Sequence, residues 1–394
     1  MEHSLFPQAR PYHWSSSGLT ERQERAFNVI AVLVVVLMMS GWVVSIVELR
    51  QVQRQEEYDQ LQAAAASRRG APLPKASPPP LFSPTRNVTS AILNPGAGST
   101  AFLNEAALSF ISPLRGYSGK VRATFTTPGA PIAKAPGSAQ ARLEGQDGVI
   151  VSSDFTAPKN PGIYNLAIQF NQAVQPIKDL SVVTLVPFNK KKQGKIGLYF
   201  LGSWPFEKGG VPKTPAYADP SGFIMVTEQN QNTMMSAHFR LRDFVTKTQF
   251  NVWPKYVLLN PKLLDKLELV ISELEASGHP VRHLQIMSAF RTPSYNYTGG
   301  NTQGRANLSR HMYGDASDVF VDNDGNGVMD DLNGDGRIDV RDAQVILAAV
   351  DRVERRHPVL VGGVGVYSAC CGHGPFTHID VRGYRARWIG FGNG

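Results

Sequence analysis

The chain has few cysteines. Its 394 residues include only Cys370 and Cys371, and adjacent cysteines rarely pair with each other because disulfide geometry needs more separation. They also lack the second pair that a four-cysteine zinc site needs. We therefore expect both to be loop residues, and no zinc site built on cysteine.

The chain also lacks a stripe of one charge. Its formal net charge of +8 is spread along the sequence. The one dense basic cluster, Lys190 to Lys192 with Lys195, is most simply a solvated loop that could also attract anionic polymers or lipid headgroups. No motif of a nucleic-acid-binding module is present. The sequence therefore predicts no nucleic-acid partner, and it leaves the oligomeric state open.

One long apolar run stands near the N-terminus, over residues 26–47. A helix of this length rises about 1.5 Å per residue and is long enough to span a bilayer. The run is too long and starts too late for a cleaved signal peptide. We predict a transmembrane signal anchor after a cytoplasmic tail, residues 1–25. Arg22 and Arg25 before it balance Arg50 and Arg54 after it, so charge alone does not orient it.

Composition divides the remainder into a linker and two domains. Residues 48–99 begin with good helix formers and become proline-rich, which predicts a helix followed by an extended spacer. Residues 100–202 contain several short alternating segments, which predict an all-β, sandwich-like domain. No group of chemically reactive residues occurs in that domain.

Residues 203–394 mix helix and strand patterns. Asn260 and Pro261 are a typical helix cap and first turn, and Gly278 marks the end of that helix. A strand is expected over 284–290 and a helix face over 340–353. The predicted fold class is α+β, with helices covering a small antiparallel sheet.

Two histidines and an aspartate in this domain have the chemistry of zinc ligands. Gly314 between His311 and Asp318 allows a tight turn into a strand. His378 and Asp380 are two apart in a β-prone run, so they share one strand face. Three protein ligands leave zinc one position for water, which loses a proton near neutral pH. The pattern indicates a zinc hydrolase.

The motif of residues 309–318, Ser-x-His-x-x-Gly-x-Ala-x-Asp, followed by a late histidine in a strand, resembles the zinc D-alanyl-D-alanine metallopeptidase family, relatives of lysostaphin and the hedgehog domain. Further matches to its cell-wall-peptidase branch lie at residues 236–244, 288–296, 363–367 and 382–388. The resemblance implies hydrolysis of peptide bonds in peptidoglycan. It also implies that His311, Asp318 and His378 bind zinc.

The candidate catalytic residues match the family's pattern at an arginine and depart from it at the general base. Arg291 resembles the family's substrate-binding arginine, and a fixed guanidinium is a strong donor to a developing oxyanion. Where relatives carry a base, this chain has Pro375 and Phe376. Asp380 and His373 are the remaining candidates, and we favour Asp380 because it shares a strand face with His378. The alternative is that Asp380 only orients the His378 imidazole.

A second metal motif interrupts the zinc motif. Residues 331–342 have the pattern of an EF-hand calcium loop with Asp at the last position, and its expected ligands are Asp331, Asn333, Asp335, Arg337 through its carbonyl, Asp339 and Asp342. A run just before it repeats the pattern with Asp322, Asp324, Asn326 and Asp330. The two loops overlap, so one calcium ion or two are possible, within an insertion at residues 322–342.

These observations predict a membrane-anchored zinc peptidase stabilised by Ca²⁺. A peptidoglycan substrate orients the anchor, with the C-terminal domains on the periplasmic or extracytoplasmic side of the cytoplasmic membrane. The alternative is a catalytically inactive peptidoglycan-binding protein that retains the zinc fold. The sequence does not separate a carboxypeptidase from an endopeptidase.

Overall fold

The computed structural model describes residues 111–391 apart from 134–139, 146–147, 171–172, 213, 300–301, 303–304 and 371. The predicted tail, membrane anchor and linker, residues 1–99, lie outside this part of the chain. No helix among the described residues is long and apolar enough to cross a membrane. The prediction of a transmembrane helix therefore has no support from the structure.

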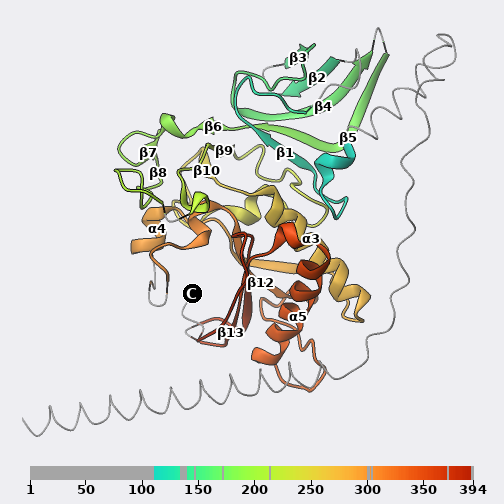
Figure 1. Ribbon diagram of the computed structural model, residues 1–394, viewed down its shortest axis with the longest axis vertical. Coiled ribbons are helices and arrows are strands. Elements are labelled where there is room, and N and C mark those ends of the chain that lie inside the picture. The colour runs from blue at the N-terminus through green and yellow to red at the C-terminus, as the bar shows by residue number, and fades with distance from the viewer. Residues whose placement is uncertain are drawn as a thin grey trace, which may run out of the picture. The chain divides into compact units, whose positions relative to one another are not determined.

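The first sheet is formed by the N-terminal part of the described chain (Figure 1). Its strands are β1 (Ala123–Thr126), β2 (Gln140–Gly145), β3 (Gly148–Ser152), β4 (Gly162–Phe170) and β5 (Ala173–Thr184). Their order is β1-β5-β4-β2-β3, and β1 pairs with β5 in parallel. Alternate residues of β4, such as Leu166 and Ile168, are buried in a core that Phe155 and Ala157 complete from a loop. Because loop residues rather than a second sheet cover this face, the prediction of a sandwich is wrong.

Short elements connect this sheet to the C-terminal one. They are β6 (Val186–Pro187), β7 (Lys195–Ile196), β8 (Tyr199–Phe200), β9 (Gly222–Val226) and β10 (Lys255–Val257). The short 3-10 helices are η2 (Ser112–Arg115), η3 (Phe188–Lys190), η4 (Pro215–Tyr217), η5 (Leu241–Phe244), η6 (Arg310–Tyr313) and η7 (Pro358–Leu360). Val121 and Val183 from the N-terminal region belong to the same buried cluster as the C-terminal residues. The two predicted domains therefore share a core.

The C-terminal sheet carries the predicted zinc ligands. Its strands are β11 (Leu284–Ser288), β12 (Ala316–Val321), β13 (Gly363–Ser368), β14 (Phe376–Asp380) and β15 (Ala386–Phe391). Their order is β11-β12-β14-β13-β15. The β13–β15 pair is parallel, because the chain runs from β13 through β14 before it returns to the other edge of β13. The sheet is therefore mixed rather than antiparallel as predicted.

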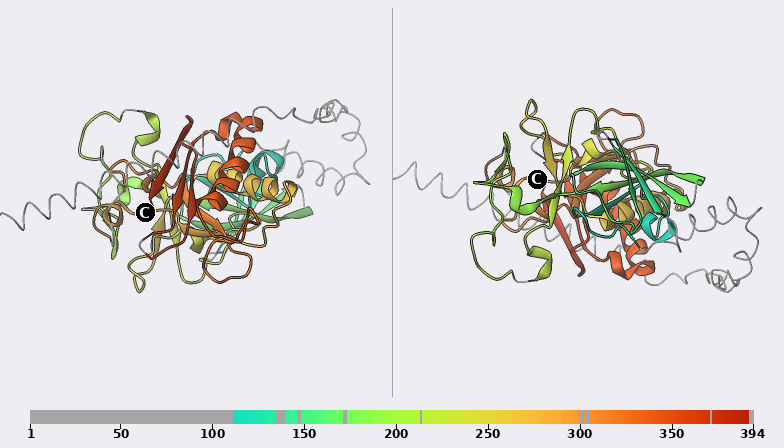
Figure 2. Two further views of the ribbon diagram at one scale, coloured as in Figure 1. Left: turned by 90° about the horizontal axis from the view of Figure 1, so that it is seen from below. Right: turned by 90° about the horizontal axis from the view of Figure 1, so that it is seen from above.

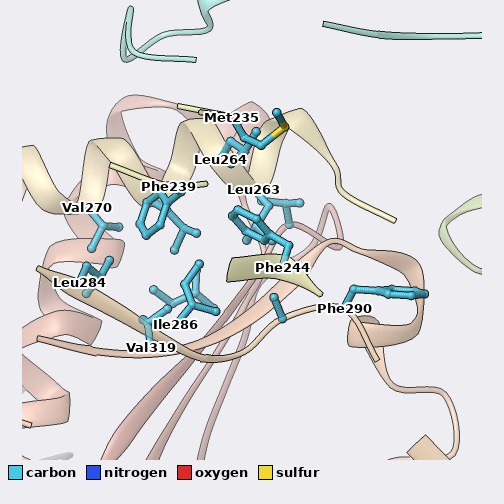
Figure 3. Close-up of a cluster of buried hydrophobic side chains, with 14 of the residues drawn as sticks. Met235, Phe239, Phe244, Leu263, Leu264, Val270, Leu284, Ile286, Phe290 and Val319 are labelled. Atoms are coloured by element: carbon cyan, nitrogen blue, oxygen red, sulfur yellow. The ribbon is translucent and has the colours of Figure 1, made fainter. Parts of the chain in front are cut away.

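Helices α3 (Pro261–Ala276) and α5 (Val340–Arg356) pack against one face of this sheet, while α4 (Pro293–Thr298) is short. The cap predicted for α3 is present, since the Asn260 side chain accepts a hydrogen bond from the Lys262 amide. Leu263 and Leu264 of α3 meet Ile286 of β11 and Val319 of β12 (Figure 3). Figure 2 shows the same helices beside the sheet from two further directions. The face of the sheet opposite to α3 and α5 carries the polar side chains of the predicted zinc ligands.

The predicted α+β class is wrong for the described residues, which form fifteen strands and three α-helices. The helices expected from sequence are present, but strands and loops make up most of the chain around them.

One cysteine also departs from expectation, because Cys370 is disulfide-bonded. Its main chain also pairs with that of His373 in an isolated antiparallel β-bridge outside the named strands.

Candidate metal centre

Two of the predicted zinc ligands lie opposite each other on neighbouring strands. Asp318 of β12 pairs directly with His378 of β14. Thr377, the residue before His378, donates its hydroxyl to the carbonyl oxygen of Ala343 in α5 at 3.0 Å. Because side chains alternate along a strand, His378 faces away from the helices. Asp318 shares that face.

His311 reaches the same place from η6. This turn ends at Gly314, whose backbone is left-handed with φ of 67°. A Cβ at Gly314 would overlap the main chain of Leu258. The turn and the close approach both require glycine. The Nδ1 of His311 donates to the carbonyl oxygen of Ala289 at 2.6 Å. A neutral ring held in this way has its lone pair on Nε2.

The three side chains converge on one point. The Nε2 of His311 is 3.1 Å from the Nδ1 of His378 and 3.2 Å from Oδ1 of Asp318. The third separation, from Nδ1 of His378 to Oδ1 of Asp318, is 2.9 Å. Ligand atoms about 2.1 Å from zinc at tetrahedral angles are about 3.4 Å apart. The donor types and their spacing therefore fit one such ion with small adjustments.

The charge of this cluster is set by burial and by Arg291. His311, Asp318 and His378 are all buried. Burial and the positive charge of Arg291 lower the pKa of His311 to about 4. Burial favours a protonated Asp318, but His311 and Arg291 outweigh it and hold the pKa of Asp318 well below its usual value. Burial lowers the pKa of His378, but its contacts with Asp318 and Asp380 outweigh burial and raise it. The cluster thus offers a neutral His311 and an ionised Asp318, and a divalent cation would have to displace a proton from His378.

Arg291 contacts a predicted ligand directly. One of its terminal nitrogens forms an ion pair with Oδ2 of Asp318, and its Nε donates to Ser288 Oγ at 2.9 Å. The other terminal nitrogen makes no hydrogen bond to a described residue. Arg291 therefore orients Asp318 and retains donors that it can offer to a ligand.

Asp380 lies on the other side of His378. The Nε2 of His378 donates to Oδ2 of Asp380 at 3.1 Å, while Nδ1 faces Asp318. Asp380 also forms an ion pair with Arg382 and accepts the Gly363 amide at 2.7 Å. Burial would raise the pKa of Asp380, but His378 and Arg382 hold it far below its usual value. This carboxylate is fully partnered by groups that fix the imidazole.

His373, the second candidate base, lies in the loop before β14. Its ring is 5.1 Å from that of Phe376 in an edge-to-face arrangement, and its Nδ1 approaches the carbonyl oxygen of Gly374 at 2.9 Å. Phe376 shares a strand face with His378. The structure therefore places His373 next to the strand of His378 but not among the three converging side chains.

Sequence reasoning gave no individual role to three residues beside His378. The residues Asp318, His378, Gly365 and Trp388 form one row across the sheet. A Cβ on Gly365 would overlap the Trp388 ring, so glycine lets the indole lie beside His378, with ring centroids 5.2 Å apart. The Trp388 Nε1 donates to the Tyr367 hydroxyl at 2.8 Å. Gly365 was the sequence signal for this arrangement, because glycine inside a strand marks a close approach of another group.

The first acidic loop brings its carboxylates together. Asp322, Asp324 and Asp330 each supply an oxygen, and these oxygens lie within 4.8 Å of one another. The amide of Asn326 donates to both Asp322 and Asp324. This loop, which the sequence favoured less, has the more compact set of carboxylates.

The second acidic loop is held by internal contacts. Arg341 forms ion pairs with Asp335 and Asp339, while Asp339 and Asp342 together cap the N-terminus of α5. The remaining members of the predicted set accept or donate local hydrogen bonds: Asp331 accepts the amides of Gly334 to Gly336, Asn333 accepts that of Asp335, and Arg337 donates its amide to Asp335. Within the described chain, these side chains do not form a group of three converging metal-ligand atoms.

No protein-family model, curated protein or solved structure matches this chain. The metallopeptidase resemblance therefore stays a prediction based on the motifs.

Proposed function

We propose that the chain is a zinc-dependent peptidase that hydrolyses peptide bonds of peptidoglycan. The observation that carries this proposal is the convergence of His311 Nε2, Asp318 Oδ1 and His378 Nδ1 on the open face of a sheet. Two neutral imidazole nitrogens and one carboxylate are the ligand set of a catalytic zinc site. The motif resemblance supplies the substrate class.

The chain's own residues prepare this ligand set. Ala289 and Asp380 accept the far N–H of His311 and His378 respectively, so each imidazole, once neutral, would present its lone pair toward the shared point. Zinc supplies a Lewis acid that polarises a peptide carbonyl and makes water nucleophilic near neutral pH. Removing either acceptor would allow the wrong tautomer.

Arg291 is placed for the charge that develops during hydrolysis. A tetrahedral intermediate is negative at the former carbonyl oxygen, and a preorganised donor in a dry site stabilises it. One terminal nitrogen of Arg291 is held by Asp318, and the other has no partner in the described chain. We assign this second nitrogen to the substrate.

Asp380 is assigned to positioning rather than to proton transfer. Its oxygens are occupied by His378, Arg382 and the Gly363 amide. A general base must accept a proton from the attacking water within hydrogen-bond reach, and such a strongly paired carboxylate is a poor acceptor. His373 is the residue that we propose for proton transfer, after a movement of its loop.

The second candidate function is a binding protein without activity, and the same full pairing of Asp380 favours it. The test is incubation of the full chain with purified peptidoglycan, with and without a chelator. We expect chelator-sensitive release of new peptide termini, absent in His378→Ala and retained in His279→Ala, a control histidine outside the site. Sedimentation with peptidoglycan without any released product would instead support the binding protein.

A peptidoglycan substrate would place the catalytic residues outside the cytoplasm. We also propose that calcium stabilises the insertion at residues 322–342, with Asp322, Asp324 and Asp330 as its first ligands because their oxygens already converge. Millimolar calcium, typical of extracellular modules, is consistent with that location.

A further inference from the structure

A pocket of about 390 Å³ lies over β11, β12 and the loop before β14. Its walls come from Gln285 and Met287 of β11, Phe320 of β12, and the loops before and after the neighbouring strands, which contribute Val328 and Pro375. Pockets of about 300–1,000 Å³ are the usual size for small ligands. This one can hold a residue-sized group.

The strand register puts this pocket on the same face as the metal ligands. Phe320 follows Asp318 by two residues in β12, so both side chains project from one face. Gln285 pairs with Phe320 across the β11–β12 ladder, so its side chain lies on that face as well. A substrate bound at the three ligands would therefore extend over the pocket along the strands.

Two loops form the outer boundary of the pocket. A Cβ on Gly374 would lie 3.5 Å from Cγ1 of Val328, so the 372–375 loop touches the 322–330 loop. His373 lines the same wall. The group that enters is thus bordered by β11 and β12 and by these two loops.

The charged side chains that line the pocket differ in their partners. The oxygens of Asp322 accept the amides of Asn326 and Gly327, both at 3.0 Å, and this carboxylate is buried. Lys247 is exposed at the rim and has neither a hydrogen bond nor an ion pair to any described residue. An ammonium without a partner in a pocket wall is suited to an anionic ligand group.

We infer that this pocket is a substrate subsite that takes a carboxylate-bearing group of the peptide, with Lys247 as its partner. The inference rests on the proposed function for the identity of the substrate. A peptidoglycan stem peptide offers two such groups, the terminal carboxylate and the free α-carboxylate of its γ-linked glutamate. Both are anionic and residue-sized.

Binding of synthetic peptides tests this without turnover. The probes are the stem pentapeptide L-Ala-γ-D-Glu-L-Lys-D-Ala-D-Ala, its C-terminal amide, and the derivative amidated at the glutamate α-carboxylate. Affinities are measured by titration calorimetry on the full chain in the presence of calcium and a zinc-selective chelator, for the wild type, Lys247→Met, Lys247→Arg and the control Lys262→Met. Lys262 is an exposed lysine of α3, which covers the opposite face of the sheet.

One of the two amidations should weaken binding to the wild type about tenfold, as expected for loss of a hydrogen bond between charged groups. Lys247→Met should lose this discrimination, while Lys247→Arg and Lys262→Met keep it; the amidation that matters identifies the group bound. Equal affinity for all three peptides, no binding of the unmodified peptide, or unchanged discrimination in Lys247→Met overturns the inference. If peptidoglycan is cleaved but the binding results overturn the subsite, the proposed peptidase function still stands. The expected binding pattern without cleavage would reject the peptidase and retain the subsite.

Discussion

The Nε2 of His378 lies 3.1 Å from Oδ2 of Asp380, on the side of the ring opposite to Asp318. This contact fixes the imidazole so that Nδ1 rather than Nε2 faces the other two ligands. Arg382 and the Gly363 amide hold the carboxylate in turn. Asp380 therefore acts on the centre through His378.

Replacing Asp380 by Asn tests this role. The amide keeps the shape but loses the charge that orients the imidazole, so zinc affinity should fall about ten- to a hundredfold. Peptidase activity should return at excess zinc. A turnover that stays about a hundredfold low at saturating zinc would identify Asp380 as the general base instead. His373→Ala, measured beside it, should lower turnover without lowering zinc affinity.

Arg291→Lys separates two roles of one guanidinium. Lysine can keep an ion pair with Asp318, but it lacks the planar second donor that we assign to the substrate. Zinc content should be nearly unchanged, while kcat should fall by about a hundredfold or more, the usual effect of losing an oxyanion donor. Loss of zinc with unchanged kcat in the loaded fraction would show that Arg291 only orients Asp318.

The ionisation of Glu268 in α3 makes the stability of the fold depend on pH. Its buried carboxylate accepts the amide of His238 at 2.8 Å and contacts the imidazole Nδ1 at 2.7 Å. Burial raises the pKa of Glu268, but the contacts with His238 outweigh it and the net pKa is lowered. The ionised form is therefore favoured in the folded state.

The stability from a lowered pKa is complete above the unfolded value, about 4.3 for Glu, and is lost as pH falls through the folded value. Glu268→Gln should cost about 1.5–3 kcal/mol at pH 7, and the difference from the wild type should shrink below pH about 4. Urea unfolding at several pH values measures this. Glu275→Gln, an exposed change on the same helix, should stay within about 0.5 kcal/mol. A difference in unfolding free energy between Glu268→Gln and the wild type that does not change with pH would contradict this role of the Glu268 carboxylate.

Calcium should raise the melting temperature of the full chain by binding the folded state. At a concentration a hundred times the dissociation constant, the gain is about 2.7 kcal/mol. Asp324→Asn should remove most of this shift, because Asp324 belongs to the converging set. Asp331→Asn tests the second loop, and a smaller loss is expected there. An equal shift in both variants and the wild type would rule out calcium binding by this insertion.

Local patterns predicted the parts of this chain that depend on local chemistry. The cap at Asn260, the turn at Gly314 and the shared strand face of His378 and Asp380 follow from backbone preferences and strand alternation, and each is present. The convergence of His311, Asp318 and His378 was predictable because the motif specifies both residue type and spacing.

Long-range pairing was not predictable in the same way. The ion pair of Arg382 with Asp380 and the indole of Trp388 beside His378 depend on how β13, β14 and β15 are ordered, which periodicity does not reveal. The sandwich prediction failed for a related reason. Alternation in β4 shows that one face is buried, but not whether a second sheet or loop residues such as Phe155 cover it.

Zinc content is the most direct test of the central claim. After exhaustive dialysis of the zinc-loaded full chain, elemental analysis should find about one tightly held zinc per molecule, as three protein ligands predict. His311→Ala and His378→Ala should retain almost none while their circular dichroism spectra stay native-like, and His279→Ala should retain the full amount. A wild-type protein without bound zinc, or a His378→Ala protein that keeps it, would contradict the metal centre described above.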